Sequence, residues 1–159
     1  MPNAGTRLLV LDNRLFDDLY VDAMVLADEA SAYLESDAGT GREPCDPFDR
    51  VQLSCESLKV TTRLMQVIAW LLTQRAAARG EIDRSELHAE KYRLGDAAPS
   101  DPRYTGMFSA EMQEIIAASE KLYLRTQRLQ EQRVDGRAVG RAPTSSPARA
   151  LMQLLEHRL

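Results

Sequence analysis

Hydrophobic and polar positions alternate with helical spacing along much of the chain, most clearly between residues 56 and 79. That segment has no Gly or Pro, and it has no acidic residue after its first position. Its large apolar residues form two sets on different faces: Leu58, Met65, Ile68 and Leu72, and Val60, Leu64, Val67 and Leu71. A helix that is apolar on two faces is buried on both. The pattern therefore predicts the central helix of a bundle, contacted by its own chain and by a second copy.

A first helix is predicted upstream, from a cap at Asp12 or Asn13 to about Asp37, and residues 1–10 are expected to be a frayed start. Its apolar stripe recurs at spacings of three and four: Leu15, Leu19, Ala23, Leu26, Ala30 and Tyr33. Its opposite face is acidic. The basic residues of the central helix are expected to complement that acidic face: Lys59, Arg63, Arg75 and Arg79.

The central helix is expected to begin at Pro47, after a cap at Asp46, and to stop at Gly80. Residues 81–94 then predict a short helix packed on the side of the bundle. A third main helix follows a cap at Ser109, with a seam formed by Met112, Ile115, Ser119, Leu122, Thr126 and Leu129. This seam is too short and too polar for a free coiled coil, so we expect it to pack on the central helix.

Residues 134–146 are rich in Gly, Pro, Ser and Arg, which is typical of a flexible linker. A short amphipathic helix is expected after them. The sequence thus predicts a helical bundle domain over 1–133 and a linker with a short C-terminal helix over 134–159. The fold class is all-α, a three-helix bundle with a long central helix, a short side helix and a C-terminal tail, assembled as a homodimer.

Charge is unevenly distributed, although the net charge is only −4. Residues 1–120 carry 12 basic and 21 acidic groups, whereas residues 121–159 carry 8 basic and 3 acidic groups. A basic tail on an acidic body suggests contact with an acidic surface, and a simply solvated tail fits equally well. The two cysteines, Cys45 and Cys55, follow no signal peptide pattern, which predicts reduced thiols in the cytoplasm. The longest apolar run, 64–72, is too short to insert in a membrane.

Motifs for chemistry are missing from the sequence. It has no nucleophile elbow, no Gly-rich phosphate loop and no closely spaced Cys or His pairs. His88 with Glu86 and Glu90 is better explained as a solvated helix surface than as a metal site. We therefore predict no enzymatic activity, no catalytic or metal-binding residue, no cofactor and no small-molecule substrate.

Two binding hypotheses remain. In the first, the central helix provides a dimer or partner interface, and its candidate residues are Leu58, Leu64, Met65, Ile68, Trp70 and Leu72. Trp70 fits a core position as well as an interface position. In the second, residues 74–94 form a helix-turn-helix-like unit of a DNA-associated regulator. The acidic residues of its second helix disfavour contact with phosphates, so nucleic-acid binding is the weaker hypothesis.

Two stretches resemble a known family. The segment SCESLKVTTRLMQVIAWLLTQRAAARGEI, residues 54–82, is similar to the signature stretch of the alphaproteobacterial DUF1465 family, which includes RcdA-like regulators of CtrA degradation. The segment DDLYVDAMVLADEASAYLE, residues 17–35, resembles the opening helix of that family. Together the two segments cover about a third of the chain, and the run TTRLMQ at residues 61–66 is the most specific part.

The resemblance implies a dimeric three-helix bundle without catalysis. It further implies an adaptor that delivers substrates of the bacterial cell cycle to the ClpXP protease. The partners expected from the family are a second copy of the chain, the protease unfoldase and a receiver-domain protein. The resemblance supplies no docking residues that can be placed on this chain.

Overall fold

The computed structural model describes residues 4–36 and 46–140, and it describes side chains within 12–36 and 46–134. Three long helices dominate this part of the chain: α1 (Ala4–Glu35), α2 (Pro47–Ala78) and α4 (Ala110–Gly140). Between α2 and α4 lie two 3-10 turns, η1 (Glu86–His88) and η2 (Glu90–Tyr92), and the one-turn helix α3 (Pro102–Thr105). The described residues form no strand, and the predicted all-α fold is confirmed.

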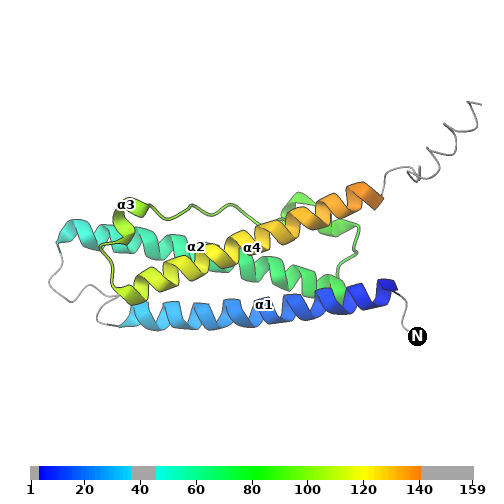
Figure 1. Cartoon of the computed structure of the whole chain (residues 1–159), viewed down its shortest axis with the longest axis horizontal. Helices are drawn as coiled ribbons and strands as arrows, with labels where there is room; N and C mark the ends of the chain where they lie inside the picture. Colours follow the sequence, from blue (N-terminus) through cyan, green and yellow to red (C-terminus); the bar gives the residue numbers. More distant parts are fainter. Residues whose placement is uncertain (1–3, 37–45, 141–159) are drawn as a thin grey trace, which may run out of the picture.

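The helices run lengthwise in an elongated bundle (Figure 1). Helix α1 is antiparallel to α2, and α4 runs parallel to α2, because the chain travels back along the bundle between them in a nonhelical return segment, residues 94–101. Contacts at both ends agree with this direction. Tyr33 near the end of α1 hydrogen-bonds Ser109 before α4 (3.0 Å), and Asp12 on α1 pairs with Arg133 on α4 (3.8 Å).

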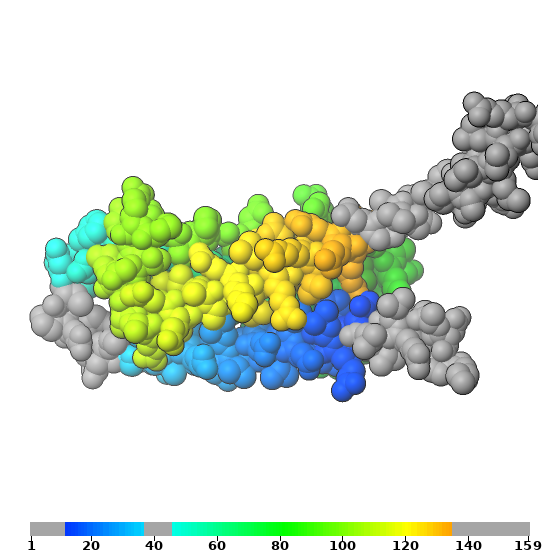
Figure 2. Space-filling view, viewed as in Figure 1, coloured from blue at the N-terminus to red at the C-terminus, as the bar shows by residue number. Residues whose placement is uncertain are grey.

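Helix α2 packs against both other long helices, and the core lies between the three. On the face shown in Figure 2, α4 lies across the seam between α1 and α2. The α2 residues with helical spacing that enter this core are Val60, Leu64, Val67, Trp70 and Leu71. The indole of Trp70 meets the ring of Phe16 edge-on, with centroids 5.6 Å apart. Trp70 is therefore a core residue.

The predicted helix signals near α2 and α4 are confirmed. The Asp46 carboxylate accepts a hydrogen bond from the Phe48 amide (3.4 Å), and Pro47 is the first helical residue. The Ser109 hydroxyl accepts from the Met112 amide (3.2 Å). After α2, Gly80 adopts φ +77°, which lies in the left-handed region. Glycine adopts this conformation at almost no steric cost because it has no Cβ atom.

Two predicted boundaries are wrong. Helix α1 begins at Ala4 instead of near Asp12, and no proline lies between these two positions to interrupt it. Helix α4 continues to Gly140, so residues 134–140 of the predicted linker are helical. The first proline that can stop α4 comes only at position 143. The remainder of the predicted linker and the C-terminal helix lie outside the described residues.

The predicted side helix is also wrong. Residues 81–94 contain only η1 and η2, because they lack the repeated apolar stripe that a helix needs for packing. The second helix of the proposed helix-turn-helix unit is therefore missing from the described structure. This removes the structural basis for the DNA-associated alternative.

Candidate interaction surface

Helix α2 exposes a row of large apolar side chains to solvent. The exposed fractions are 58 % for Val51, 68 % for Leu58, 65 % for Met65 and 46 % for Leu72. These positions are seven residues apart and therefore follow one face of the helix. We call this row, with Ile68 beside it, the α2 stripe.

The α2 stripe faces away from the core. At about 100° per residue, Val67 lies roughly 200° around the helix from Met65. Val67 has no exposed surface, and Val60 and Leu71 on the same side are also buried. The two apolar faces predicted from the sequence are thus both present, and residues 12–36 and 46–134 cover only one of them.

Between residues 51 and 73, the outward face of α2 carries no charged side chain. Hydroxyl groups on this face are satisfied within the helix. Thr61, Thr62 and Thr73 donate to the carbonyls of the residues four positions earlier, at 2.8–2.9 Å. Their methyl groups therefore add to an apolar surface. Protein interfaces are depleted in charge at their centres, and this face has that character.

The six predicted interface residues differ in their exposure to solvent. Leu58, Met65 and Leu72 are exposed on the α2 stripe, and Ile68 is half-buried beside them. Leu64 and Trp70 are instead buried in the core, with 4 % and 3 % exposed. These two contact the chain's own helices and are not available to a partner.

Helix α1 adds apolar residues that were not predicted as part of a surface. Val21, Met24 and Val25 are exposed by 38–58 %. The Asp17 carboxylate on α1 pairs with Arg75 on α2 at 3.2 Å. Val21 lies one turn after Asp17, and Leu72 lies about one turn before Arg75, so the exposed residues of α1 and α2 border the same seam. Because these residues lie among acidic residues on the helix, their spacing did not indicate an apolar surface in the sequence.

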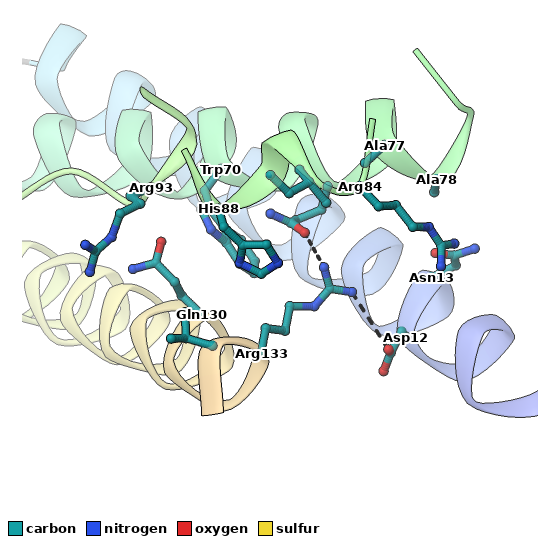
Figure 3. A pocket seen from close by; sticks show the side chains of 13 residues that line it. Asp12, Asn13, Trp70, Ala77, Ala78, Arg84, His88, Arg93, Gln130 and Arg133 are labelled. Carbon is teal, nitrogen blue, oxygen red and sulfur yellow. Dashed lines mark hydrogen bonds and ion pairs between the residues drawn. The ribbon is translucent and has the colours of Figure 1, made fainter. Parts of the chain in front are cut away.

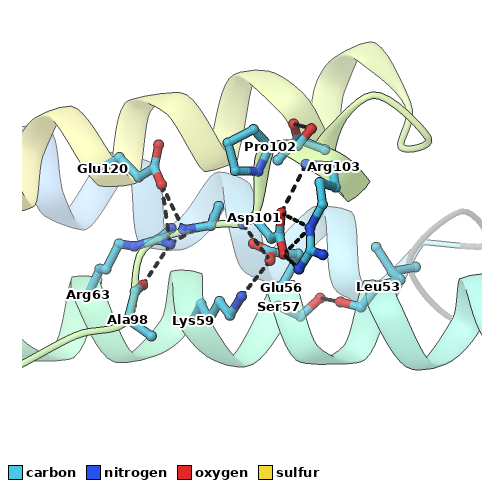
Figure 4. Close-up of polar contacts among 12 residues, drawn as sticks. Leu53, Glu56, Ser57, Lys59, Arg63, Ala98, Asp101, Pro102, Arg103 and Glu120 are labelled. Atoms are coloured by element: carbon cyan, nitrogen blue, oxygen red, sulfur yellow. Dashed lines mark hydrogen bonds and ion pairs between the residues drawn. The ribbon is translucent and has the colours of Figure 1, made fainter.

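A buried polar cluster fixes the return segment to α2 and α4 (Figure 4). Arg63 on α2 is 1 % exposed. Its guanidinium donates to the Ala98 carbonyl (2.9 Å), the Ser100 hydroxyl (2.8 Å) and the Ser119 hydroxyl (3.0 Å), and it lies 3.6 Å from a Glu120 oxygen. Burial lowers the pKa of Arg63, while Glu120 and Glu56 oppose that change. The predicted role of Arg63 as a surface partner of α1 is wrong.

Glu56 is the second buried charge of this cluster. One of its oxygens accepts from the Lys59 ammonium (2.8 Å) and from the Asp101 amide (3.5 Å). Its other oxygen, Oε2, has no hydrogen-bond partner among the described residues. Burial raises the pKa of Glu56, but the hydrogen bonds from Lys59, Ser100 and Asp101 outweigh it, so the net pKa is lowered. The cluster thus holds the return segment through a charged carboxylate and a charged guanidinium.

The other candidates for chemistry remain separate side chains. Cys55 is exposed and unpaired in the described part, and Cys45 lies outside it. Within residues 12–36 and 46–134, no three His, Cys, Asp or Glu side chains converge as a metal site would require. The described helices include none with the length and hydropathy to cross a bilayer.

The chain is similar to the crystal structure of RcdA from Caulobacter crescentus CB15. The two are 30 % identical with a TM-score of 0.59, and the match covers 74 % of this chain and 89 % of that chain. Among curated proteins, none matches this chain.

A family model described as "Protein of unknown function (DUF1465)" matches residues 9–159. This match includes both stretches that carry the resemblance, and it extends through residues 134–159, which the resemblance did not cover. The similarity in sequence and the helical architecture agree with each other. The chain therefore belongs to the DUF1465 family.

Proposed function

We propose that this protein is a non-catalytic, homodimeric adaptor in regulated proteolysis in the bacterial cytoplasm. The observation that carries the proposal is the α2 stripe, an uncharged apolar face that the chain leaves exposed. Membership of the DUF1465 family and the similarity to RcdA support the choice of pathway. In this proposal the protein delivers cell-cycle substrates to the ClpXP protease, together with a receiver-domain protein.

A second copy of the chain is the occupant that best fits the α2 stripe. From Val51 to Leu72 the stripe is about 30 Å long at 1.5 Å per residue, which is comparable to the length of a stable helix–helix contact. Dimers with two-fold symmetry use the same patch on both subunits. An apolar face satisfies that requirement directly, because it complements itself without any pairing of opposite charges.

An antiparallel pairing of α2 with α2 suits the stripe best. It places Leu58 of one copy against Met65 of the other, and Val51 against Leu72, with Thr62 near the two-fold axis. A parallel pairing would align the two helix dipoles. It would also bring together both copies of Arg79, which continues the same seven-residue spacing after Leu72.

The adaptor mechanism requires no bond chemistry. A dimer that holds a substrate and a protease component raises their effective concentration toward each other, and this accelerates delivery without any new contact between them. The α2 stripe would assemble the platform, and the remaining surface of α1 would stay available for other proteins.

Reconstituted proteolysis with purified components tests this proposal. The assay follows degradation of a cell-cycle substrate by ClpXP and a receiver-domain protein, with and without this chain. We expect the wild-type chain to accelerate degradation and Met65→Asp, which places a charge on the exposed stripe, to lose most of that effect. Arg128→Gln, on an exposed part of α4, is the matched control and should act like the wild type. Degradation at the same rate with and without the wild-type chain would contradict the adaptor role.

A further inference from the structure

A cavity of about 640 Å³ lies at one end of the bundle, away from the α2 stripe. Its walls are the beginning of α1, the ends of α2 and α4, and the segment that carries η1 and η2 (Figure 3). This volume falls within the range of roughly 300–1,000 Å³ that is typical of small-molecule sites. The adaptor role proposed above makes no use of it.

The cavity is lined by three arginines that come from separate elements. Arg133 comes from α4, whereas Arg84 and Arg93 come from the segment between α2 and α3. Asp12 is the one carboxylate among the described lining residues, and it lies 3.8 Å from Arg133. Neither Arg84 nor Arg93 forms an ion pair with a carboxylate in the described part of the chain. The described lining therefore carries three guanidinium charges against one carboxylate.

Arg133 is held in place from several sides. Its guanidinium donates a hydrogen bond to the Gln74 side chain and lies 4.5 Å from the centre of the Phe16 ring. Burial lowers the pKa of Arg133, the charge of Arg84 lowers it further, and Asp12 acts in the opposite direction. Arg84 and Arg133 thus repel each other across the same cavity. A bound anion would relieve this repulsion.

The rest of the lining is suited to a flat apolar group. Half-buried Leu87 contributes hydrophobic surface, and Trp70 lies at the base of the cavity with only 3 % of its surface exposed. The half-buried amide of Gln130 adds polar atoms near Arg93 (Figure 3). Ligand sites commonly combine an apolar wall with a few polar groups that orient the ligand. Arginine is the side chain best suited to bidentate contacts with phosphate and carboxylate groups.

We propose that this cavity binds a small organic anion, a phosphate or carboxylate attached to a flat apolar body about the size of a nucleotide. Arg84, Arg93 and Arg133 bind the charged group, and the wall near Trp70 contacts the apolar body. The proposal is compatible with the expectation of no small-molecule substrate, because the ligand is bound and not converted. It does not depend on the adaptor role.

The tryptophan provides a direct readout, because Trp70 is the only tryptophan of the chain and lines this cavity. The full-length protein is titrated with adenosine 5′-monophosphate and with N-benzoylglutamate, which present a phosphate and two carboxylates on an aromatic body. Two control probes each lack one part of the ligand: adenosine lacks the charged group, and inorganic phosphate lacks the aromatic ring. Fluorescence of Trp70 and calorimetric heat are measured for each. We expect saturable binding of at least one organic anion, at least tenfold tighter than adenosine or phosphate.

Variants at the exposed arginines locate the site without disturbing the core. Arg84→Gln and Arg93→Gln should each weaken binding of the organic anion by about tenfold, the usual effect of losing a charged hydrogen bond. Arg128→Gln, on another face of α4, and Met65→Asp on the α2 stripe should leave the affinity unchanged.

Two outcomes would overturn the proposal. One is that neither organic anion binds at millimolar concentration, or that adenosine binds equally well. The other is that a glutamate-rich peptide binds through Arg84 and Arg93 while both small anions do not, because the cavity would then be a docking point for a protein chain.

Discussion

Arg63 is the largest fully buried side chain among the described residues, and its guanidinium joins α2 to the return segment and to α4. In the sequence it looked like one of four basic residues on a helix surface. Its burial depends on Ala98, Ser100 and Ser119, which are 35–56 positions away in sequence. No local sequence pattern reveals contacts between residues so far apart, so the buried position of Arg63 could not be predicted.

Replacing Arg63 should weaken the whole bundle. Arg63→Met keeps the aliphatic volume but leaves Glu120 without its cationic neighbour and the Ala98 carbonyl without its donor. Loss of one partner of a buried charged group costs about 3 kcal/mol or more. Chemical denaturation should show this decrease, and hydrogen exchange should show reduced protection in residues 94–101. Arg128→Met is the control, and equal stability of the two variants would contradict the anchoring role.

Glu56 should make the fold sensitive to acid. Because the pKa of Glu56 is lowered in the folded state from its ordinary value of 4.5, its stabilising effect is complete above that value. The effect is lost as the pH falls through the lower folded-state pKa. Glu56→Gln should therefore flatten the decrease in unfolding free energy on going from pH 5 to pH 3. Arg103 holds the folded-state pKa of Asp101 at about 2, below its ordinary value of 3.8, so Asp101 also loses part of its stabilising effect over this range. That loss is common to the wild type and to Glu56→Gln, and the difference between their slopes therefore reports Glu56. An unchanged acid slope in Glu56→Gln would disprove the linkage.

Substitution of Gly80 should destabilise the fold because of the backbone conformation at this position. Its φ of +77° costs about 1–2 kcal/mol in a residue with a Cβ atom, even though no atom lies within 4 Å of the position that the Cβ would take. Gly80→Ala should lower the melting temperature by several degrees. Gly106 has φ −67° and similarly open surroundings, so Gly106→Ala should leave the melting temperature unchanged or raise it. Equal melting temperatures for the two variants would show that the turn after α2 adopts another conformation.

At the scale of elements, the two apolar faces of α2 were predictable from spacing alone. Which face the chain covers was not, because that depends on where α1 and α4 approach. Leu64 and Trp70 belong to the covered face, although both were assigned to the interface. For residues 81–94, the predicted element itself was wrong. A short polar stretch after Gly80 looked helical, but it has too little apolar surface to keep a helix on the bundle.

Antiparallel pairing of α2 makes a specific prediction for disulfide formation. In a background of Cys45→Ser and Cys55→Ser, Thr62→Cys lies near the proposed two-fold axis, where two Cα atoms can approach within the roughly 7 Å that a disulfide spans. We expect rapid disulfide-linked dimers on mild oxidation, seen on a nonreducing gel. Thr73→Cys is the control, because antiparallel helices separate its two copies by about 30 Å.

Linkage of both cysteine variants would indicate a parallel arrangement. Linkage of neither would show that the α2 stripe does not meet its own copy. In either case the proposed pairing of Leu58 with Met65 would be wrong.

At the scale of the whole molecule, the sequence predicted three main helices but not their directions. The parallel arrangement of α2 and α4 results from the return segment, which carries the chain back along the bundle between them. This segment is held by side chains from both helices, including Gln66, which accepts from the Gly95 amide (3.1 Å), and Tyr123, which donates to the Gly95 carbonyl (2.8 Å). The described part of the bundle therefore buries one face of α2 and leaves the opposite face exposed.

The mass of the protein in solution tests the central claim most directly. Light scattering of the full chain, coupled to size-exclusion chromatography, should give twice the chain mass of 17.8 kDa. Met65→Asp should give the mass of one chain while it keeps its helical circular dichroism, because position 65 is exposed and the substitution leaves the core intact. A wild-type mass of 17.8 kDa at micromolar concentration, or a Met65→Asp variant that remains dimeric, would contradict assembly through the α2 stripe.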